Sequence, residues 1–344
     1  MSKTVQPNAV HTRISGALRG VLILMVVSVA INYIDRGSLS TAVPLLEKEL
    51  ALSPMQLGIL LSAFFWTYSF LQIVSGWLAD RYDVKWVMAI GFLVWSVAAA
   101  ATGLVYTFSW SVPTVANGVV HAFGLLLVFR LLLGVGESVA FPCYSKIIAR
   151  NYAEHQRGLA NALIDAGGKV GPALGTLAGG VLMSHCGWRP VFIVLGLGSL
   201  LWLPAWFKWV PRQRQPGRIA TSGGPGFVEI LSQRSAWATF MGHFCGNYLW
   251  YFLLTWLPGY LVKERGFSMD TMAVVGSLAF FVTATATTIT GWLADRAIAA
   301  GSTPTRIRKT CTITGLAFAT VILAVVVVPG SFASMAFLMF ACLS

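Results

Sequence analysis

Long runs of apolar residues alternate along the chain with short polar segments. A helix needs about twenty apolar residues to cross a bilayer, and runs of this length recur from residue 20 onward. The pattern predicts membrane helices at about residues 20–38, 55–78, 86–106, 119–148, 159–183, 188–209, 236–262, 271–293 and 309–328, with a short loop at 47–54 after the first. A tenth apolar run reaches Ser344 unfinished. We therefore expect an all-α polytopic membrane protein with nine to ten helices.

The polar segments divide this pattern into two halves. A polar tail occupies residues 1–17, and a six-helix bundle follows at 18–210. A glycine-containing linker at 211–235 leads to a second, partial bundle at 236–344, with helices seven to nine and part of helix ten. Because two equal halves would need roughly two and a half more helices, we expect a truncated gene product or a fragment, or a chain completed by another segment.

The hexapeptide Gly-Trp-Leu-Ala-Asp-Arg occurs twice, at residues 76–81 and 291–296. Each copy closes a long apolar run, so its acid and arginine stand where a membrane helix would emerge into water. An identity of this length indicates an internal repeat. The alternative is a membrane-edge cap with no mechanical role.

The composition agrees with a membrane protein, since 56% of the residues are hydrophobic and 10% are charged. A net charge of +12 would suggest a nucleic-acid partner if it were clustered on a water-soluble face. The basic residues instead fall in alternate loops. If the N-terminus is cytoplasmic, the opposite side of the membrane carries only Lys48, Arg189, Lys263 and Arg265 outside the helices. The positive-inside rule therefore predicts a cytoplasmic N-terminus and no nucleic-acid partner.

The cysteines and histidines are dispersed without metal-ligand spacing or a disulfide framework. We expect neither a metal site nor another cofactor. No nucleophile motif or nucleotide-binding loop is present, so the chain is not expected to be an enzyme. The first apolar run follows Arg13 and Arg19 but has no small-residue cleavage site, which indicates an uncleaved helix rather than a signal peptide.

Charged residues inside the predicted helices indicate chemistry, because a charge in a bilayer is costly unless it is paired or hydrated. Arg130 and Glu137 are seven residues apart, which places both on one helix face, about 10 Å apart along the axis. They are expected to face an internal cavity with Asp35 and Arg36 from the first helix. An anion that binds an arginine would release its carboxylate partner for protonation, which would link proton and anion uptake. A permanent ion network that only fixes helix packing is the alternative.

The hexapeptides and these charges together resemble the major facilitator superfamily. The run Asn-Tyr-Ile-Asp-Arg at 32–36, Arg130 with Gly134, Gly136 and Glu137, and the stretch 247–260 are similar to its anion:cation symporter branch. That branch includes bacterial proton-coupled carriers of galactonate, glucarate and hexuronates. The resemblance implies a fold of two pseudo-twofold-related six-helix halves, the second incomplete here.

The resemblance also implies roles for individual residues. Asp35 and Glu137 match proton-coupling acids, while Arg36, Arg130 and Tyr68 match substrate-binding residues. The seventh helix supplies further candidates for substrate binding, His243, Asn247 and Tyr248. Tyr68 and Tyr248, with Trp250 and Tyr251, could equally be packing aromatics. In the family the hexapeptide loop resembles a gating latch, here Asp80, Arg81, Asp295 and Arg296.

These observations predict a monomeric carrier that moves a small organic anion, a sugar acid, with protons across the bacterial inner membrane by alternating access. An anion exchanger is one alternative. A non-transporting receptor or assembly subunit is another, favoured if the chain is truncated.

The fifth helix is unusually polar and glycine-rich. Gly167, Gly171, Gly175 and Gly179 recur every fourth residue, which lets another backbone approach closely. On the same helix, Asp165 and Lys169 are four residues apart. They are expected to neutralise one another, and a role for Lys169 in anion binding is the alternative.

Overall fold

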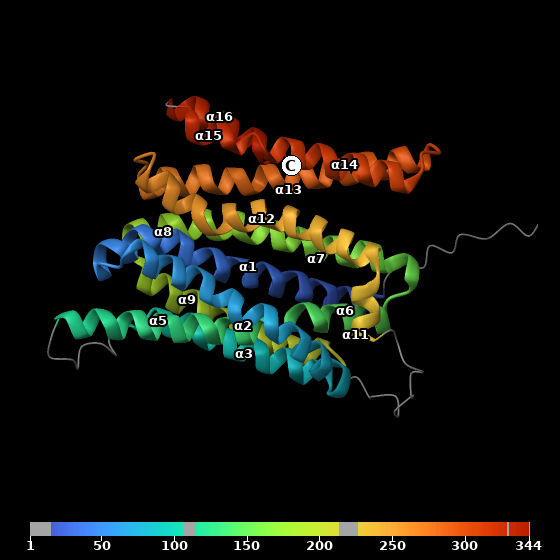
Figure 1. Cartoon of the computed structure of the whole chain (residues 1–344). Helices are drawn as coiled ribbons and strands as arrows, with labels where there is room; N and C mark the ends of the chain where they lie inside the picture. Colours follow the sequence, from blue (N-terminus) through green and yellow to red (C-terminus); the bar gives the residue numbers. More distant parts are fainter. Residues whose placement is uncertain (1–14, 106–114, 213–225, 329, 344) are drawn as a thin grey trace, which may run out of the picture.

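The computed structural model describes residues 15–105, 115–212, 226–328 and 330–343. Within these ranges the chain is helical and contains no strand (Figure 1). Most of the predicted tail at 1–17 and of the predicted linker at 211–235 lies outside the described residues. The all-α fold predicted from the sequence is confirmed.

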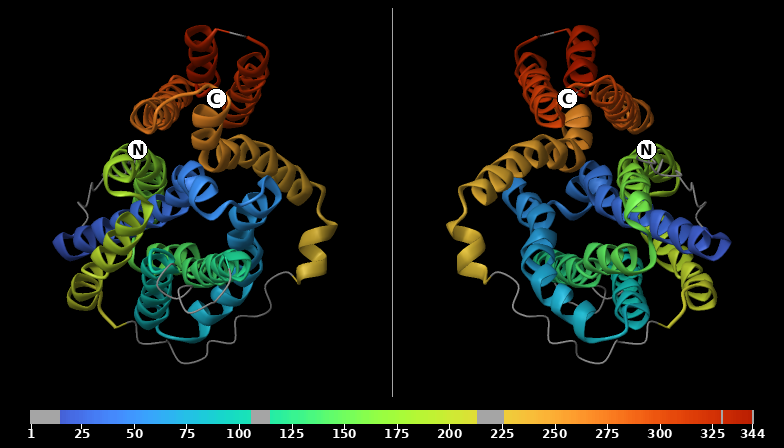
Figure 2. Two further views of the ribbon diagram at one scale, coloured as in Figure 1. Left: turned by 90° about the vertical axis from the view of Figure 1, so that its left-hand side faces the viewer. Right: turned by 90° about the vertical axis from the view of Figure 1, so that its right-hand side faces the viewer.

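The first half contains ten helical segments among the described residues. They are α1 (Gly16–Leu50), α2 (Pro54–Arg81), α3 (Val84–Thr102), α5 (Val115–Glu137), α6 (Ala140–Asn151), α7 (Glu154–Leu174), the π-helix η1 (Gly175–Gly179), α8 (Gly180–Cys186), α9 (Trp188–Ser199) and α10 (Trp202–Trp209). The second half contains α11 (Phe227–Ser232), α12 (Arg234–Lys263), α13 (Met269–Ala299), α14 (Pro304–Ala319), α15 (Ile322–Val327) and α16 (Ser331–Ala341). Seen along the helices, α12 to α16 lie on one side of the first bundle (Figure 2).

The first helix is longer than predicted, because α1 continues through Glu47 to Leu50. Only Ala51 to Ser53 connect it to α2. Ala51 takes the left-handed conformation that ends a helix. Ser53 and Gln56 then form a capping box at the start of α2. The predicted loop at 47–54 was therefore too long, since the capping residues confine the turn to three positions.

The fourth predicted helix is interrupted directly after Glu137, so α5 and α6 are separate. At the break, the Ser138 hydroxyl donates a hydrogen bond to the Val135 carbonyl, which competes with the backbone pattern of a helix. The preceding glycines serve close packing. A Cβ on Gly136 would lie 2.6 Å from Trp95 N on α3, and one on Gly134 would lie 2.4 Å from Phe64 O on α2. Glu137 is therefore held between α2 and α3 at a helix end.

The glycine stripe of the fifth helix packs against α1. A Cβ on Gly167, Gly171 or Gly175 would come within about 3 Å of α1 atoms, as close helix approach requires. Gly179, the fourth glycine of the stripe, departs from the prediction, because a Cβ added there would contact nothing within 4 Å. At the next residue, a Cβ on Gly180 would lie 2.7 Å from Ala273 Cβ of α13. The π-helix η1 explains this change, since its wider turn shifts the register by one residue.

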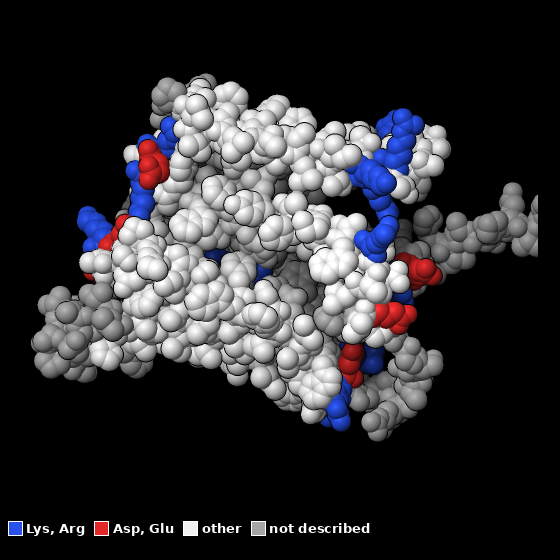
Figure 3. All heavy atoms as spheres, in the orientation of Figure 1, with Lys and Arg blue, Asp and Glu red and all other residues white. Residues whose placement is uncertain are grey.

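Charged side chains gather at the two ends of the helices, with an uncharged belt between them (Figure 3). Seven helical segments of the described chain are long and apolar enough to cross a membrane. The fifth and seventh predicted spans are not among them. The reason is that α7 and α12 carry polar residues such as Asn161, Lys169 and His243, which line an internal cavity rather than face lipid.

The two halves touch mainly at one end of the bundle. We name this the Glu47 end and the opposite one, where α2 finishes, the Asp80 end. Glu47 of α1 forms an ion pair with Lys263 of α12. Nearby, the Ser40 hydroxyl donates a 2.7 Å hydrogen bond to the Leu254 carbonyl, and the Ser184 hydroxyl donates one of 2.5 Å to Asp270. These contacts hold the halves together on the Glu47 side of the membrane belt.

Candidate functional site

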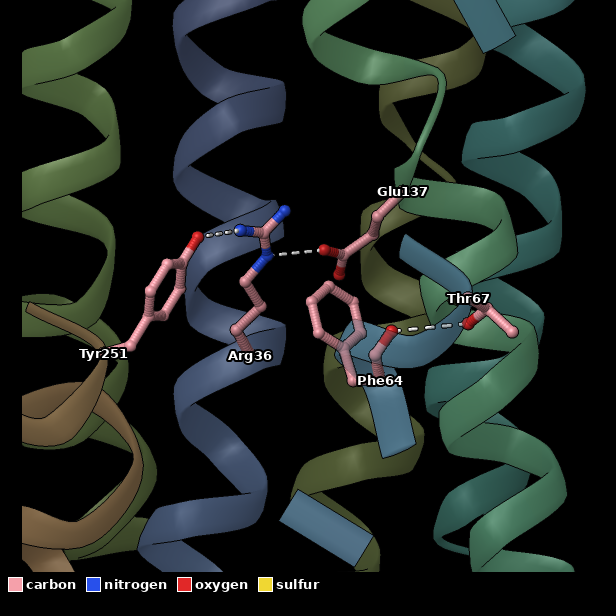
Figure 4. Close-up of polar contacts among 5 residues, drawn as sticks. All are labelled: Arg36, Phe64, Thr67, Glu137 and Tyr251. Atoms are coloured by element: carbon pink, nitrogen blue, oxygen red, sulfur yellow. Dashed lines mark hydrogen bonds and ion pairs between the residues drawn. The ribbon is translucent and has the colours of Figure 1, made fainter. Parts of the chain in front are cut away.

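A buried ion pair joins the first and fourth predicted helices. Arg36 Nε of α1 lies 2.7 Å from Glu137 Oε2 at the end of α5, and both side chains are excluded from solvent. Figure 4 shows the arginine between Glu137 on one side and Tyr251 of α12 on the other. Arg36 Nη1 donates to the Tyr251 hydroxyl at 3.4 Å. The guanidinium therefore connects the first half to the second.

Aromatic rings surround the same guanidinium. Its carbon lies 4.3 Å from the ring centroid of Tyr68, 4.7 Å from that of Tyr33 and 4.9 Å from that of Phe64. Cation–π contacts of this kind stabilise a cation that is buried without water. Arg36 is thus kept charged inside the bundle by one carboxylate and several ring faces.

Next to the pair, several buried polar atoms have no hydrogen-bond partner among the described residues. They are both amide atoms of Asn32, Asp35 Oδ2, Arg36 Nη2, Arg130 Nε and Nη2, and Glu137 Oε1. Asp35 lies within electrostatic range of both Glu137 and Arg130. Buried polar groups are normally satisfied, so such a group of exceptions in one place calls for an explanation. A site that exchanges its partners during a functional cycle provides one.

A cavity of about 780 Å³ lies between the halves. Gln72 of α2 and Asn161 of α7 contribute to its wall, both in the part of the bundle toward the Asp80 end. In the space-filling view this face is hollowed, and basic atoms are visible inside the hollow (Figure 3). The cavity is large enough for a small organic molecule.

Three of the predicted substrate-binding residues line this cavity, namely Tyr68, His243 and Asn247. Tyr248 does not. It is 70% exposed and lines a separate groove between α2 and α12. Asn247 lines both the cavity and this groove, whereas Tyr248, turned by about 100° further around α12, lines the groove and not the cavity.

The four intramembrane charges were expected to face the cavity directly. The structure brings them together but places them behind its aromatic wall, which Tyr33, Tyr68 and Tyr251 form. Arg36 and Arg130 border instead a pocket of about 20 Å³ on the far side of this wall. Movement of these rings would be needed for an anion to reach Arg36.

The predicted gating residues lie at the Asp80 end. Asp80 Oδ1 is 3.5 Å from Lys146 Nζ of α6, and the same ammonium donates to the Ala79 carbonyl. Arg81 stacks on Trp77 at 5.2 Å, as Arg296 does on Trp292 at 5.4 Å. Asp295 is exposed. The first copy of the hexapeptide is thus tied to the neighbouring helix α6 through its acid, with Lys146 as the partner.

Two residues that sequence reasoning did not select are central to the geometry. Tyr251 bonds Arg36 across the halves, and Tyr33 separates Arg36 from Trp250. Both belong to the motifs that carry the resemblance, but their partners lie more than two hundred residues away in the chain. Among the described residues, no three His, Cys, Asp or Glu side chains come together as a metal site.

Comparison with known proteins places this arrangement in a family. A family model described as Major Facilitator Superfamily matches residues 25–344. The hexuronate transporter of Bacillus subtilis is 28% identical over 264 residues, which cover 74% of this chain and 59% of that protein. A probable sulfoacetate transporter of Cupriavidus necator is 30% identical over 77% of this chain and 62% of its own length. A probable galactarate/D-glucarate transporter of Escherichia coli is 29% identical over 91% of this chain and 74% of its own length. The chain thus spans about three fifths of the first two relatives.

Solved structures show the same fold. A bacterial homologue of the human lysosomal transporter Spinster, inward-facing and unoccupied, matches with a TM-score of 0.73 at 20% identity, over 96% of this chain and 73% of that one. A D-xylose-proton symporter matches with a TM-score of 0.70 at 16% identity, over 95% and 80%. The family and these relatives are transporters, which confirms that the chain is not an enzyme. The chain belongs to the major facilitator superfamily.

Proposed function

We propose that this protein carries a small organic anion, a sugar acid, together with protons across the bacterial inner membrane. The observation that carries the proposal is the closed Arg36–Glu137 pair with Arg130 and Asp35 beside it, the last two bearing buried polar atoms without partners. A purely structural ion network would have its polar atoms satisfied. Here a second arginine and a second acid stand ready for other partners.

The coupling follows from a change of partners. When Arg36 turns to a bound anion, Glu137 loses its counter-ion. A buried carboxylate without a counter-ion is more stable when it takes up a proton. Anion and proton would therefore enter the site together, and they would leave together when the Arg36–Glu137 pair forms again. Asp35, near both Glu137 and Arg130, is the second proton site in this scheme.

The positions of the cavity and of the contacts between the halves support alternating access. With a cytoplasmic N-terminus, as the basic residues predict, the cavity faces the cytoplasm and the Glu47 end is closed on the outside. Tyr251 and Arg36 form a contact between the halves at the centre of the bundle. Rocking of the halves about this centre would open the Glu47 end and close the Asp80 end.

The names of the relatives support an acidic substrate. Hexuronate and galactarate or glucarate are sugar acids, and sulfoacetate is also a small organic anion. The cavity wall offers hydroxyl and amide groups for sugar hydroxyls, from Tyr68, Asn161 and Asn247. The residues named for this site all come from one chain, which agrees with a monomeric carrier.

Uptake into proteoliposomes tests the proposal. We expect radiolabelled glucarate, galactonate or glucuronate to accumulate when the inside of the vesicle is alkaline, and accumulation to stop when a proton uncoupler is added. Equal accumulation with and without the uncoupler would contradict proton coupling. Counter-flow that proceeds without any pH gradient, and with no net uptake, would favour an exchanger instead.

A further inference from the structure

Lys169 of α7 is a cavity-lining cation that the proposed coupling does not use. It was expected to be neutralised by Asp165, one helical turn earlier. The structure shows no such pair, because no oxygen of Asp165 lies within 4.0 Å of Lys169 Nζ. The ammonium lies instead over the ring of Trp250, 4.4 Å from its centroid. Its N–H groups are available to the cavity that both residues line.

A chain of aromatic contacts connects Lys169 to Arg36. The guanidinium carbon of Arg36 lies 4.7 Å from the centroid of the Tyr33 ring. The Tyr33 and Trp250 rings meet edge to face with centroids 6.1 Å apart, and Lys169 Nζ lies 4.4 Å from the Trp250 centroid. The two cations therefore stand on different helices, with Lys169 on the cavity wall and Arg36 behind the Tyr33 ring. Tyr33 and Trp250 both line the cavity between them. Their ring faces and edges form a surface on which an elongated ligand can lie.

The charges on this wall are unevenly distributed along the cavity. Asp165 is the one carboxylate among the described residues that line it, and it lies a turn closer than Lys169 to the Asp80 end. Lys169 is the one lysine or arginine among the described lining residues, and the Arg36 guanidinium lies behind the lining residue Tyr33. Lys169 also borders a second cavity of about 230 Å³, but that lining is mostly apolar and offers an anion little besides Lys169 itself. The larger cavity is the place where Lys169 can meet an anion.

We infer that Lys169 binds the second carboxylate of a dicarboxylate substrate whose first carboxylate goes to Arg36. The inference rests on the proposed function and narrows its substrate class from sugar acids in general to aldarates. In an extended six-carbon chain the two carboxylate carbons are about 6 Å apart, from C–C bonds of about 1.5 Å. A monocarboxylate can satisfy one of the two cations, whereas an aldarate can satisfy both. A charge-assisted hydrogen bond to Lys169 should then distinguish the two classes by about tenfold or more in affinity.

Glucarate and gluconate form the matched pair for the test. They have the same six carbons and differ at one end, a carboxylate in one and a hydroxymethyl group in the other. Binding of each radiolabelled acid to the purified full chain in detergent gives the preference as a ratio of dissociation constants. We expect wild-type protein to prefer glucarate by at least about tenfold. In the Lys169→Gln protein the ratio should fall close to one through weaker glucarate binding, with gluconate binding changed less than about twofold. Lys169→Arg, which keeps the charge, should restore most of the preference.

The Asp165→Asn/Lys169→Gln double variant separates this role from charge balance. If Lys169 only neutralises Asp165, removal of both charges restores the wild-type preference. If Lys169 binds substrate, the ratio of dissociation constants stays close to one in the double variant, as in Lys169→Gln. Lys208→Gln removes an exposed lysine of α10, outside the cavity lining, and should leave the ratio unchanged.

The outcomes also separate this inference from the proposed function. Gluconate and glucarate bound and transported equally well by wild-type protein would overturn the inference and leave proton-coupled anion transport intact. Equal loss of both acids in Lys169→Gln would overturn it in the same way. Failure of wild-type protein to bind either acid would remove both ideas together.

Discussion

The two copies of Gly-Trp-Leu-Ala-Asp-Arg have the same internal structure and different surroundings. In each copy the arginine stacks on the tryptophan four residues earlier, at 5.2 Å in the first and 5.4 Å in the second. In the first copy Ala79 is fully packed and Asp80 meets Lys146 of α6. In the second copy Asp295 forms no ion pair among the described residues, although the two tryptophans are similarly exposed, at 52% and 58%. A repeated sequence therefore fixes local geometry, while the helix packed beside it decides whether a latch exists.

The same contrast holds inside the membrane belt. The first half buries Asp35, Arg36, Arg130 and Glu137. In the described part of the second half, the buried polar residues are Ser277, Thr283 and Ser334, all uncharged. The second half contributes the cavity wall through α12. Among the described residues, the buried carboxylates and arginines therefore lie in the first half, while α12 adds amide and hydroxyl groups such as those of Asn247 and Tyr251 to the cavity wall.

Removal of the Glu137 charge should have the largest effect on transport, because Glu137 is the carboxylate paired with Arg36. In Glu137→Gln protein we expect proton-driven uptake to fall by at least about a hundredfold, since the site loses a proton acceptor. Exchange of labelled for unlabelled anion should persist, because Arg36 is then permanently available to substrate. Uptake driven by an imposed pH gradient measures the proton-coupled reaction in proteoliposomes, and counter-flow without a gradient measures the exchange.

Thr283→Val is the matched control in the second half. Thr283 is buried on α13, and its hydroxyl donates to the Ala279 carbonyl of its own helix. We expect proton-driven uptake within about a factor of two of wild type, because the substitution removes no acid or base. Proton-driven uptake that survives Glu137→Gln, or that is lost equally in both variants, would contradict the division of roles.

A smaller effect is expected from the acids of the two hexapeptides. Asp80 and Lys146 both belong to the first half, so their contact can persist in both states of the carrier. The Asp80 side chain is 83% exposed and can meet the second half when the Asp80 end closes. Asp80→Asn should therefore weaken the closed end. An exposed ion pair contributes up to about 1 kcal/mol. The ratio of molecules open at the Asp80 end to molecules closed there should therefore rise by up to about fivefold.

Accessibility of a cysteine in the cavity measures this shift. Gln72→Cys places a thiol in the wall toward the Asp80 end. Its labelling by a membrane-impermeant reagent from that side should be faster in Asp80→Asn protein. Asp295→Asn, in the exposed second copy, should leave the rate unchanged. Equal acceleration by both substitutions would show that the acid acts through general surface charge and not through its neighbours.

The sequence predicted the helices, the repeat and the buried charges because each depends on local pattern. Runs of apolar residues determine membrane helices, and charges inside such runs must be buried together. What could not be predicted depends on packing between distant segments. The break after Glu137, the shift from Gly179 to Gly180 and the partner Lys146 of Asp80 all arise where helices meet. Tyr248 shows the same limit, because Asn247 before it lines the cavity while Tyr248 lines only the groove between α2 and α12.

The smallest expected effect concerns the local geometry that the two hexapeptides share. Trp77→Leu and Trp292→Leu each remove one exposed cation–π contact, worth about 0.5–1 kcal/mol. Trp77 has an additional partner, since its ring also meets Tyr82 edge-on at 6.3 Å, whereas Ala297 occupies the matching position of the second copy. We therefore expect Trp77→Leu to lower thermal stability in detergent slightly more than Trp292→Leu does. In a Tyr82→Ala background this excess should disappear, because both tryptophans then support only their arginine. A difference that persists in that background would mean that surroundings, and not the repeated sequence, set even the internal structure of the hexapeptide.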